Sequence, residues 1–431
     1  MGNGSSKLLK QFSDRLWSDT ELRDRFIQAF DNPPPLHPCI LWCEDPPLER
    51  PFAVETPQPW QPERVDRLSL GAQPGKHPAH DRGAYYCLDF SSVFAASPLL
   101  HLSGIQTAID VCAAPGGKSL FTWHTLQPDL LVCNEVVGKR LGTLMANLRR
   151  CQVSNVSEPE EAIGPDSMTP VSSGMPYSVD PPKSPLERGT FTAPLSKSET
   201  FTTPLSKSET FTTPLSKSET FTAPLSKSET FTTPLSKSET FTAPLSKSET
   251  FAAPLSKGGW GDQNAPNKSE KRCIATQLDP QRLAQQFPQA FQLVLVDAPC
   301  SGQSLLLKQK KVPGCFHKVT LNRNANRQKR IVGNAAQLVA PQGYLLYMTC
   351  TYSLEENEQI CNWLLKKYPH FQPVSVPHLL DYQSHLSDLP CYRLWPYQGL
   401  GAGAFTALFQ NQNLGEVRAI SREDLAAINR L

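Results

Sequence analysis

The segment "TAIDVCAAPGGKSLFTWHTL", Thr107–Leu126, joins a short run of β-forming residues to a run of helix formers through a turn with two adjacent glycines. This order is typical of a strand, a tight turn and a helix. A second such unit follows at once, with a strand-like Leu130–Val136 and a helix-like Gly138–Cys151. Strand and helix therefore alternate through this part of the chain.

The same alternation returns in the C-terminal part. It continues through the strand-like or helix-like segments Lys271–Thr276, Phe291–Cys300, Asn326–Val339 and Gly343–Cys350. Strands that alternate with helices are joined by right-handed crossovers into a doubly wound parallel sheet. We therefore expect an α/β fold with a doubly wound, mostly parallel sheet, and ligands at the carboxyl ends of its strands.

Acidic residues and a glycine-rich turn mark those strand ends. Asp110, Glu135 and Asp297 each fall at the end of a strand-like run. Gly116 and Gly117 let the backbone come close to a ligand, and the next helix begins with free N–H groups. The turn lacks the G-x-G-x-x-G spacing of nicotinamide dinucleotide sites. Because Glu135 is placed to accept from both ribose hydroxyls, we expect a nucleoside cofactor without a pyrophosphate, S-adenosylmethionine; a tight turn without a ligand would look the same.

Two cysteines follow apolar runs at strand ends, Cys300 in "DAPCSG" and Cys350 in "YMTCTYS". The alternative for either is a small buried hydrophobe, the commonest role of a free cysteine. Both strands should open onto one cleft, however, and methylation of a pyrimidine at carbon 5 needs a thiol there. Carbon 5 of cytosine is too weak a nucleophile until a thiolate adds at carbon 6, and such covalent catalysis divides one difficult step into two. The thiol must be activated by its surroundings.

Five motifs follow one another along the chain: "DVCAAPGGKS", "NEV", "VLVDAPCSG", "YMTCTYSLEENE" and "RLWPYQGLGAGAFTALF". In this order they closely resemble the RNA 5-methylcytosine methyltransferases of the Sun/Fmu type. The resemblance spans Gly83–Gln410 apart from an insertion. It implies a Rossmann-like class I methyltransferase fold, S-adenosyl-L-methionine as cofactor and structured RNA as substrate, with ribosomal RNA favoured over transfer RNA.

The resemblance also implies roles for individual residues. Cys350 would be the nucleophile that adds to carbon 6, and Cys300 would assist release of the methylated base. Asp297 would hydrogen-bond the cytosine edge. The residues implied to bind the cofactor are Ala113, Ala114, Pro115, Gly116, Gly117 and Lys118 around methionine and ribose, Glu135 at the ribose, Asp279 at the adenine amine, and Asp297. For Asp279 the alternative is a carboxylate at the N-terminus of a helix.

Two segments depart from the family pattern. The family usually continues the Pro-Cys motif as SG-x-G with an arginine soon after, whereas residues 301–311 read "SGQSLLLKQKK". Before the glycine-rich turn the family often has a Gln-Asp pair, whereas this chain has Leu88 and Asp89. Both segments would face the substrate, so they bear on the identity of the target base.

The stretch between the two cysteines supports an RNA partner. It contains no acidic residue from Cys300 to Leu354. Its basic residues are Lys308, Lys310, Lys311, Lys318, Arg323, Arg327, Lys329 and Arg330. Such a run is usually a solvated face, but on a nearly neutral chain and between two candidate thiols it favours phosphate binding. The target cytosine must also leave its stack to reach Cys350, which favours a structured RNA with an accessible cytosine.

Composition limits the setting. The chain has 431 residues, a formal net charge of +2 and 39% hydrophobic residues. No segment approaches ~18 consecutive apolar residues, and the first residues lack the apolar core of a signal peptide. We expect a cytoplasmic monomer without a membrane partner, with its twelve cysteines reduced. Cys39 and Cys43 form a close pair, but no second pair follows at a similar spacing, so we expect no metal.

A decapeptide repeat interrupts the domain. Six copies of FT(A/T)PLSKSET run from Phe191 to Thr250, and a seventh, "FAAPLSK", ends at Lys257. Each copy offers too little apolar surface to offset the entropy of ordering. We therefore expect residues 157–270 to be a disordered insertion. A partner-binding or phosphorylated array is the alternative.

The remaining chain divides around this insertion. We expect a small N-terminal α+β region at residues 1–76 that positions RNA, with a helix in "SDTELRDRFIQAF" capped by Ser18 or Asp19 and a strand in "HPCILWCED". The methyltransferase domain would comprise residues 77–156 and 271–412, and residues 413–431 would form a C-terminal tail.

Two other functions compete with an RNA cytosine-C5 methyltransferase. A DNA cytosine methyltransferase would use the Pro-Cys thiol as its nucleophile, which would leave the Thr-Cys motif without a role. A catalytically silent RNA-binding or ribosome-assembly factor on the same fold would be favoured by loss of Cys350, Cys300 or Asp297, and all three are present.

Overall fold

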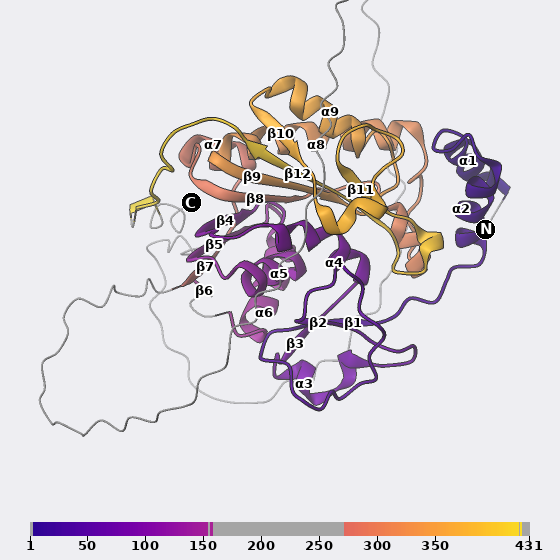
Figure 1. Cartoon of the computed structure of the whole chain (residues 1–431), viewed down its shortest axis with the longest axis horizontal. Coiled ribbons are helices and arrows are strands. Elements are labelled where there is room, and N and C mark those ends of the chain that lie inside the picture. Colours follow the sequence, from indigo (N-terminus) through magenta and orange to yellow (C-terminus); the bar gives the residue numbers. More distant parts are fainter. Residues whose placement is uncertain (1–2, 154–155, 158–270, 422, 425–431) are drawn as a thin grey trace, which may run out of the picture. The chain divides into compact units, whose positions relative to one another are not determined.

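The computed structural model describes residues 3–153, 156–157, 271–421 and 423–424 (Figure 1). The expected insertion lies outside the described residues except for Ser157. Residues 422 and 425–431 of the expected C-terminal tail also lie outside them. Within the described part, no helix combines the length and the hydropathy needed to cross a membrane.

A mixed sheet forms the centre of the described chain. Its strands are β4 (Thr107–Asp110), β5 (Leu130–Asn134), β6 (Val156–Ser157), β7 (Arg272–Thr276), β8 (Phe291–Asp297), β9 (Val339–Thr349), β10 (Phe371–Val374), β11 (Cys391–Leu394) and β12 (Ala404–Asn411). They lie in the order β10-β12-β9-β8-β4-β5-β7-β6, and β11 also pairs with β12. The strands from β4 to β9 pair in parallel, whereas β12 runs antiparallel to β9 and β10.

This order confirms the doubly wound, mostly parallel sheet. From β4 the chain moves outwards to β5 and the edge strand β6, comes back to place β7 between these two, and then places β8 on the opposite side of β4. The direction of winding therefore reverses between β4 and β8. Ligands of such sheets bind at this reversal, outside the carboxyl ends of the strands.

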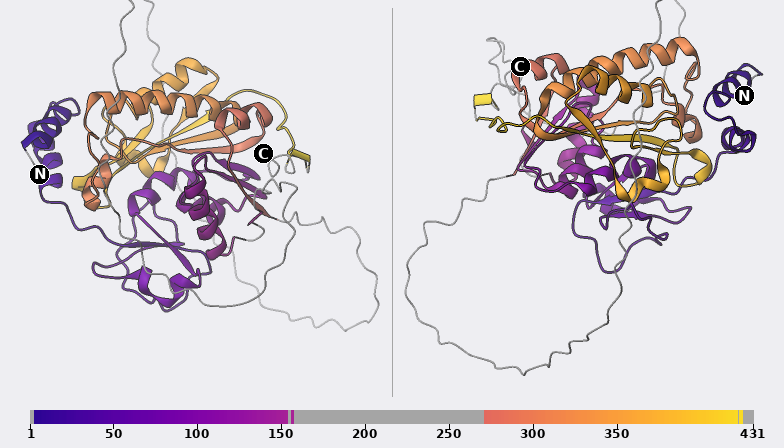
Figure 2. Two further views of the ribbon diagram at one scale, coloured as in Figure 1. Left: turned by 180° about the vertical axis from the view of Figure 1, so that it is seen from behind. Right: turned by 45° about the horizontal axis from the view of Figure 1, so that its top comes forward.

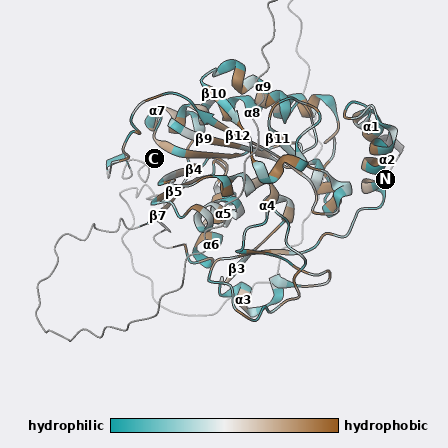
Figure 3. Cartoon of the chain, in the orientation of Figure 1, coloured by the Kyte–Doolittle hydropathy of each residue, from teal (hydrophilic) through white to brown (hydrophobic). Residues whose placement is uncertain are grey.

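Helices cover both faces of the sheet (Figures 1 and 2). Alternate strand residues point to opposite faces, so Ala108 and Leu131 pack in one core and Ile109 and Val132 in the other. The first core includes residues of α4 (Phe90–Ala96), α5 (Gly117–Leu126) and α6 (Gly138–Arg150). The second includes residues of α7 (Pro280–Gln286), α8 (Lys318–Leu338) and α9 (Glu358–Lys367). Hydrophobic and hydrophilic residues alternate along these helices (Figure 3), as the burial of one helix face requires.

The N-terminal residues form two helices and a small sheet. Helix α2 (Thr20–Asp31) confirms the expected helix, and Asp19 caps it by accepting from two backbone N–H groups. Strand β1 (Cys39–Trp42) confirms the expected strand and pairs with β2 (Val65–Arg67) and β3 (Tyr85–Leu88). Because β3 belongs to this sheet, the small sheet extends beyond residue 76, the boundary expected from the sequence.

Helices α1 (Asn3–Ser13) and α2 pack against the C-terminal half of the chain. Phe26 contacts both Tyr352 and Trp395 edge to face, with ring centroids 5.2 and 5.9 Å apart. The N-terminal helices thus lie against the segment that follows Cys350.

The remaining short elements are α3 (Pro78–Asp81) and the 3-10 turns η1 (Pro74–Lys76), η2 (Ser97–His101), η3 (Gln303–Lys308), η4 (Pro377–Tyr382) and η5 (Pro396–Gln398).

Candidate active site

Cys300 and Cys350 lie side by side, with their Sγ atoms 3.2 Å apart. Cys350 directly follows β9 and Cys300 lies in the loop after β8, and these two strands are parallel neighbours. The hydrogen bond from the Cys300 thiol holds the pKa of Cys350 below its ordinary value, against the effect of burial, and Lys118 acts in the same direction. The same contact and burial raise the pKa of Cys300. Of the two thiols, Cys350 therefore ionises first.

An ion pair lies beside the thiols. Lys118 Nζ is 2.7 Å from Asp297 Oδ2, and both side chains are largely buried. Burial alone would lower the pKa of Lys118, but the Asp297 carboxylate raises it above its ordinary value. Since Lys118 lies at the start of α5, directly after the glycine-rich turn, and Asp297 ends β8, the pair joins the cofactor turn to the thiol loop.

A buried carboxylate ties the two thiol loops together. Glu356 Oε1 accepts from the Ser301 backbone N–H at 2.8 Å and from Gln328 Nε2 at 3.1 Å. Gln328 Nε2 also donates a hydrogen bond to the Pro299 carbonyl oxygen, at 3.1 Å. Burial raises the pKa of Glu356, while the hydrogen bond from Ser301 opposes that rise. Through Gln328, helix α8 is attached to the same junction.

Gln303 makes a second bridge between the loops. Its Oε1 accepts from Thr351 Oγ1 and from the Tyr352 backbone N–H, both at 2.8 Å. Its Nε2 donates to the Cys315 carbonyl at 2.9 Å. Because Gln303 is fully buried, these bonds fix the chain on either side of the thiol pair.

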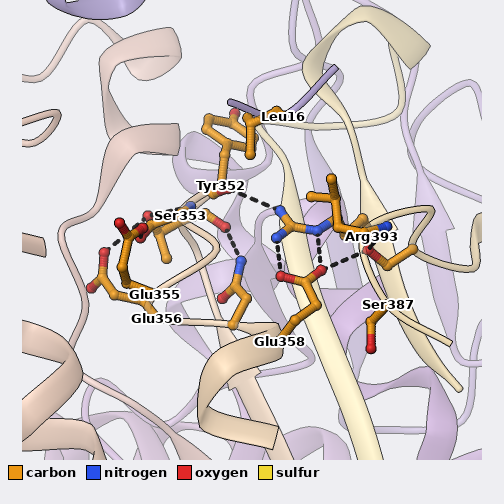
Figure 4. Close-up of polar contacts among 12 residues, drawn as sticks. Leu16, Tyr352, Ser353, Glu355, Glu356, Glu358, Ser387 and Arg393 are labelled. Atoms are coloured by element: carbon orange, nitrogen blue, oxygen red, sulfur yellow. Dashed lines mark hydrogen bonds and ion pairs between the residues drawn. The ribbon is translucent and has the colours of Figure 1, made fainter. Parts of the chain in front are cut away.

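A fully buried ion pair supports the segment after Cys350 (Figure 4). Glu358 and Arg393 form a two-pronged pair in which Arg393 Nε donates to Glu358 Oε1 at 2.6 Å. Both side chains are 1% exposed. Arg393 also donates to the Tyr352 carbonyl at 3.1 Å, and Ser384 Oγ donates to Glu358 at 2.6 Å. The pair therefore connects α9, β11 and the thiol loop.

The glycine-rich turn has the geometry of a backbone cradle. The Ala114–Pro115 peptide is cis, and Gly116 adopts φ +114°, a left-handed conformation that favours glycine. A Cβ at Gly117 would lie 3.2 Å from the Tyr86 ring. Asn147 Nδ2 donates to the Pro115 carbonyl at 2.8 Å, so α6 supports the turn from behind.

Glu135 is fixed at the end of β5. Its Oε1 accepts from the Val137 backbone N–H at 2.9 Å. Its Oε2 is buried and lies 3.0 Å from Arg140 Nη1, but that contact is not aligned as a hydrogen bond, so the oxygen keeps its accepting capacity. Arg140 also donates to the Ala114 carbonyl at 2.5 Å. Arg140 therefore links Glu135 to the cradle.

A cavity of about 280 Å³ opens beside Glu135. It lies between the loops after β4, β5 and β8 on one side and α7 and α8 on the other. Asp279, Arg140, Arg327 and Arg330 also line it. Asp279 is the N-cap of α7 and accepts from the Gln281 backbone N–H at 2.8 Å. It thus both caps a helix, as the alternative reading expected, and faces the cavity.

Asp110 lies beneath the turn rather than in the cavity. It is fully buried and accepts from Ser119 Oγ at 2.7 Å and from the Cys112 backbone N–H at 3.2 Å. Burial raises its pKa to about 7, although the hydrogen bond from Ser119 opposes the rise.

The two segments that depart from the family pattern contact each other. Lys308 Nζ lies 2.7 Å from Asp89 Oδ2. Burial alone would raise the pKa of Asp89, but Lys308 lowers it below its ordinary value. Ser304, which stands at the second glycine of the family pattern, is buried and its side chain helps to lower the pKa of Cys350. These residues therefore belong to the thiol side of the site.

The structure thus divides the residues expected from the sequence into two sets. Cys300, Cys350, Asp297 and Lys118 form one set around the thiols. Glu135 and Asp279 form the other around the cavity, and the turn at residues 113–118 connects them. Among the described residues, no group of three or more His, Cys, Asp or Glu side chains is arranged to hold a metal ion.

Sequence reasoning missed the residues that hold these sets in place. They are Arg140, Gln303, Gln328, Glu356, Glu358 and Arg393. Glu356 and Glu358 stand within the quoted "SLEENE" motif, so their position was a signal. Arg393 begins the quoted "RLWPYQGLGAGAFTALF" motif, so its position was also a signal, whereas Gln328 stands outside the motifs in a run that showed only helical spacing.

Comparison with known proteins gives these features a context. The sequence model of the family described as 16S rRNA methyltransferase RsmB/F matches residues 265–410. The ribosomal RNA small subunit methyltransferase F of Psychromonas ingrahamii is 30% identical over 139 residues, which cover 32% of this chain and 29% of that protein. The corresponding protein of Klebsiella pneumoniae is 33% identical over 113 residues, covering 26% and 23%. The matched part therefore spans less than a third of either relative.

Solved structures match over more of the chain. A methyltransferase homologue from Pyrococcus horikoshii has a TM-score of 0.56 at 15% identity, and the match covers 95% of this chain and 96% of that one. NSun6 from the same organism, solved with SFG, has a TM-score of 0.54 at 12% identity, with 95% and 98% covered. At these identities the likeness shows the fold alone, the Rossmann-like fold of a methyltransferase.

Proposed function

Because the chain belongs to the RsmB/F methyltransferase family, we propose that it transfers a methyl group from S-adenosylmethionine to carbon 5 of cytosine in RNA. The observation that carries this proposal is the thiol pair. Two sulfurs 3.2 Å apart, one favoured as thiolate and the other as thiol, suit a reaction that needs a nucleophile and a separate helper.

Cys350 acts first in this mechanism. Its thiolate adds to carbon 6 of the cytosine and makes carbon 5 nucleophilic. Bound S-adenosylmethionine supplies the methyl group that carbon 5 takes up. The proton on carbon 5 then passes to solvent, the double bond between carbons 5 and 6 re-forms from the electrons of that C–H bond, and the carbon–sulfur bond breaks so that Cys350 departs as a thiolate. Cys300 assists this elimination, since it lies in contact with the departing sulfur.

Asp297 and Lys118 position the base. Asp297 accepts a hydrogen bond from the exocyclic amine of the cytosine, while Lys118 holds the carboxylate in place. Lys118 also keeps a positive charge near Cys350, which favours the thiolate. Burial excludes water from these charges and strengthens their effect.

The cavity fits the cofactor. Glu135 offers a buried oxygen with free accepting capacity, which suits ribose hydroxyls. Asp279 would face the adenine amine, and the backbone at Gly116 and Gly117 would approach the methionine portion, where a side chain would crowd the turn. The NSun6 structure holds SFG, an analogue of S-adenosylmethionine, which supports this assignment by analogy of fold.

The RNA is proposed to be ribosomal. The curated relatives are named for the small-subunit ribosomal RNA, and the basic run between the two thiols provides cations for phosphates. Bisulfite sequencing of total RNA from a deletion strain, with and without the gene restored, tests this. One cytosine of 16S ribosomal RNA should lose its methyl group in the deletion strain, and loss from transfer RNA instead would overturn the choice of RNA.

The mechanism is tested by making the two thiols fail differently. Cys350→Ala should abolish methyl transfer and form no covalent adduct, while RNA still binds. Cys300→Ala should still attack the base and then stall, so a protein–RNA adduct should survive denaturing electrophoresis. The double variant should form none. An adduct with Cys350→Ala but not with Cys300→Ala would reverse the roles, as a DNA-type mechanism requires, and wild-type methylation by both variants would favour two structural thiols.

A further inference from the structure

Two arginines on α8 line the cofactor cavity without a carboxylate partner. Arg327 and Arg330 are exposed and lie one turn apart on the same face of the helix. Within the described residues, neither makes an ion pair or a side-chain hydrogen bond. Since both border the cavity, their charges act on whatever binds there.

The two carboxylates of the cavity do not balance its cations. Glu135 lies between the Val137 N–H and the Arg140 guanidinium. Asp279 accepts from the backbone of α7. Three arginines, Arg140, Arg327 and Arg330, therefore face two carboxylates, and the wall keeps an excess of positive charge.

S-adenosylmethionine cannot neutralise those charges. At neutral pH it carries a sulfonium, an ammonium and a carboxylate, which leaves a net positive charge. The cofactor should therefore be bound less tightly while Arg327 and Arg330 are unpaired, and an anion beside them should favour it. RNA phosphate is the anion that the proposed substrate supplies.

Helix α8 is well placed to relay this contact. Between the two arginines, the buried Gln328 donates to the Pro299 carbonyl and to Glu356. These bonds fix α8 to the loop that carries Cys300. A phosphate held by the arginines would therefore sit at a defined distance from the thiols.

We propose that Arg327 and Arg330 form a phosphate subsite for RNA in the wall of the cofactor cavity, so that RNA and S-adenosylmethionine bind cooperatively. The inference rests on the proposed function. It adds that methyl transfer loosens the complex, because the sulfonium becomes a neutral thioether when its methyl group bonds to carbon 5. S-adenosylhomocysteine should thus favour RNA binding less than S-adenosylmethionine does.

The test measures the affinity for a 16S ribosomal RNA transcript with S-adenosylmethionine, with S-adenosylhomocysteine and with neither. Cys350→Ala serves as the background, because it prevents turnover. We expect S-adenosylmethionine to tighten RNA binding by about five- to tenfold, within the usual range of coupling between sites, and S-adenosylhomocysteine to do less. Reciprocity requires RNA to tighten S-adenosylmethionine binding by the same factor.

Three variants in that background decide the matter. Arg327→Ala/Arg330→Ala should lose the coupling and bind S-adenosylmethionine alone no more weakly than its parent does. Arg323→Ala is the matched control, since Arg323 is exposed on the same helix but does not line the cavity; it should weaken RNA binding and keep the coupling. Arg327→Lys/Arg330→Lys, which retains both positive charges, should keep most of the coupling between RNA and S-adenosylmethionine binding.

The possible outcomes distinguish a failure of the phosphate subsite from a failure of the proposed methyltransferase function. Unchanged coupling in Arg327→Ala/Arg330→Ala would overturn the subsite while leaving the methyltransferase intact. Weaker binding of S-adenosylmethionine alone in that variant would also overturn it, because the arginines would then be part of the cofactor site. If the parent protein bound neither S-adenosylmethionine nor RNA, the proposed function itself would fail.

Discussion

The thiol side and the cofactor side of the site are built differently. Around Cys300 and Cys350, buried side chains such as Gln303, Glu356 and Arg393 hold the loops with several hydrogen bonds each. Around the cavity, the half-exposed Arg140 makes the main link between Glu135 and the cradle. The chemical step needs sulfur atoms held in place, whereas a cofactor must enter and leave in every turnover. The difference indicates where the molecule is rigid and where it has room to adapt.

The largest loss of stability should follow from removing one charge of the buried ion pair on the thiol side, Glu358–Arg393. Arg393→Met leaves Glu358 buried without its partner, and breaking a buried pair in this way usually costs about 3 to 5 kcal/mol. Urea unfolding should show a loss of that size in the free energy of unfolding. Adding Glu358→Gln should recover part of it, because no buried charge is then left alone. A loss below ~1 kcal/mol for Arg393→Met would mean that the pair does not support the loop.

Asp110, between the two sides, should give stability a dependence on pH. Burial raises its pKa to about 7 from the ordinary value of 3.8, so the folded state keeps a proton that the unfolded state loses. This contribution is fully present below about pH 4 and is lost as pH rises through 7, with a slope of about 1.4 kcal/mol per pH unit. Asp110→Asn should flatten that slope in urea unfolding between pH 5 and 7. An unchanged slope would show that Asp110 ionises normally.

The sequence predicted the strand ends better than it predicted what supports them. Alternation of strands and helices fixes which residues reach the carboxyl edge of a parallel sheet, so Asp297, Cys300 and Cys350 could be expected in one place. The structure brings the two sulfurs within contact. Their roles stay predictions, because they depend on the reaction and not on the fold.

The supporting contacts could not be predicted because they join segments far apart in the chain. Arg393 reaches Glu358 only because β11 pairs with β12, and β12 inserts antiparallel beside β9. Neither pairing is visible in local periodicity. The ion pair between Lys308 and Asp89 likewise depends on how η3 lies beside the start of α4, where Asp89 is the N-cap. In both cases tertiary packing selects the partner.

On the cofactor side, a single substitution should have a smaller and more specific effect. Glu135→Ala removes the oxygens assigned to the ribose, and calorimetry should show S-adenosylmethionine binding weakened by about 1.5 to 3 kcal/mol, the scale of a hydrogen bond to a charged group. Lys139→Ala, an exposed neighbour, is the control and should bind normally. Unchanged affinity in Glu135→Ala would remove the ribose assignment.

The smallest effect should come from the insertion, which interrupts the chain at the cofactor edge of the sheet. It separates β6 from β7, which pair in parallel through Val156 and Cys273. A parallel pair needs a crossover of a dozen or more residues, so a Gly/Ser linker of about 15 residues in place of residues 158–270 should be long enough. The affinity for S-adenosylmethionine should stay within a few-fold of the full chain's value in calorimetry, because the cavity is lined by residues outside the insertion.

The stability of the shortened protein tests the same expectation. If the insertion acts as a flexible loop, each halving of its length lowers the entropic cost of loop closure by about 0.6 kcal/mol, and the shortened protein should unfold no more easily than the full chain. A five-residue linker, too short to cross over, is the control that should destabilise the protein. Loss of cofactor binding or of folding with the longer linker would show that the repeats are part of the structure and would place them on the cofactor side of the comparison.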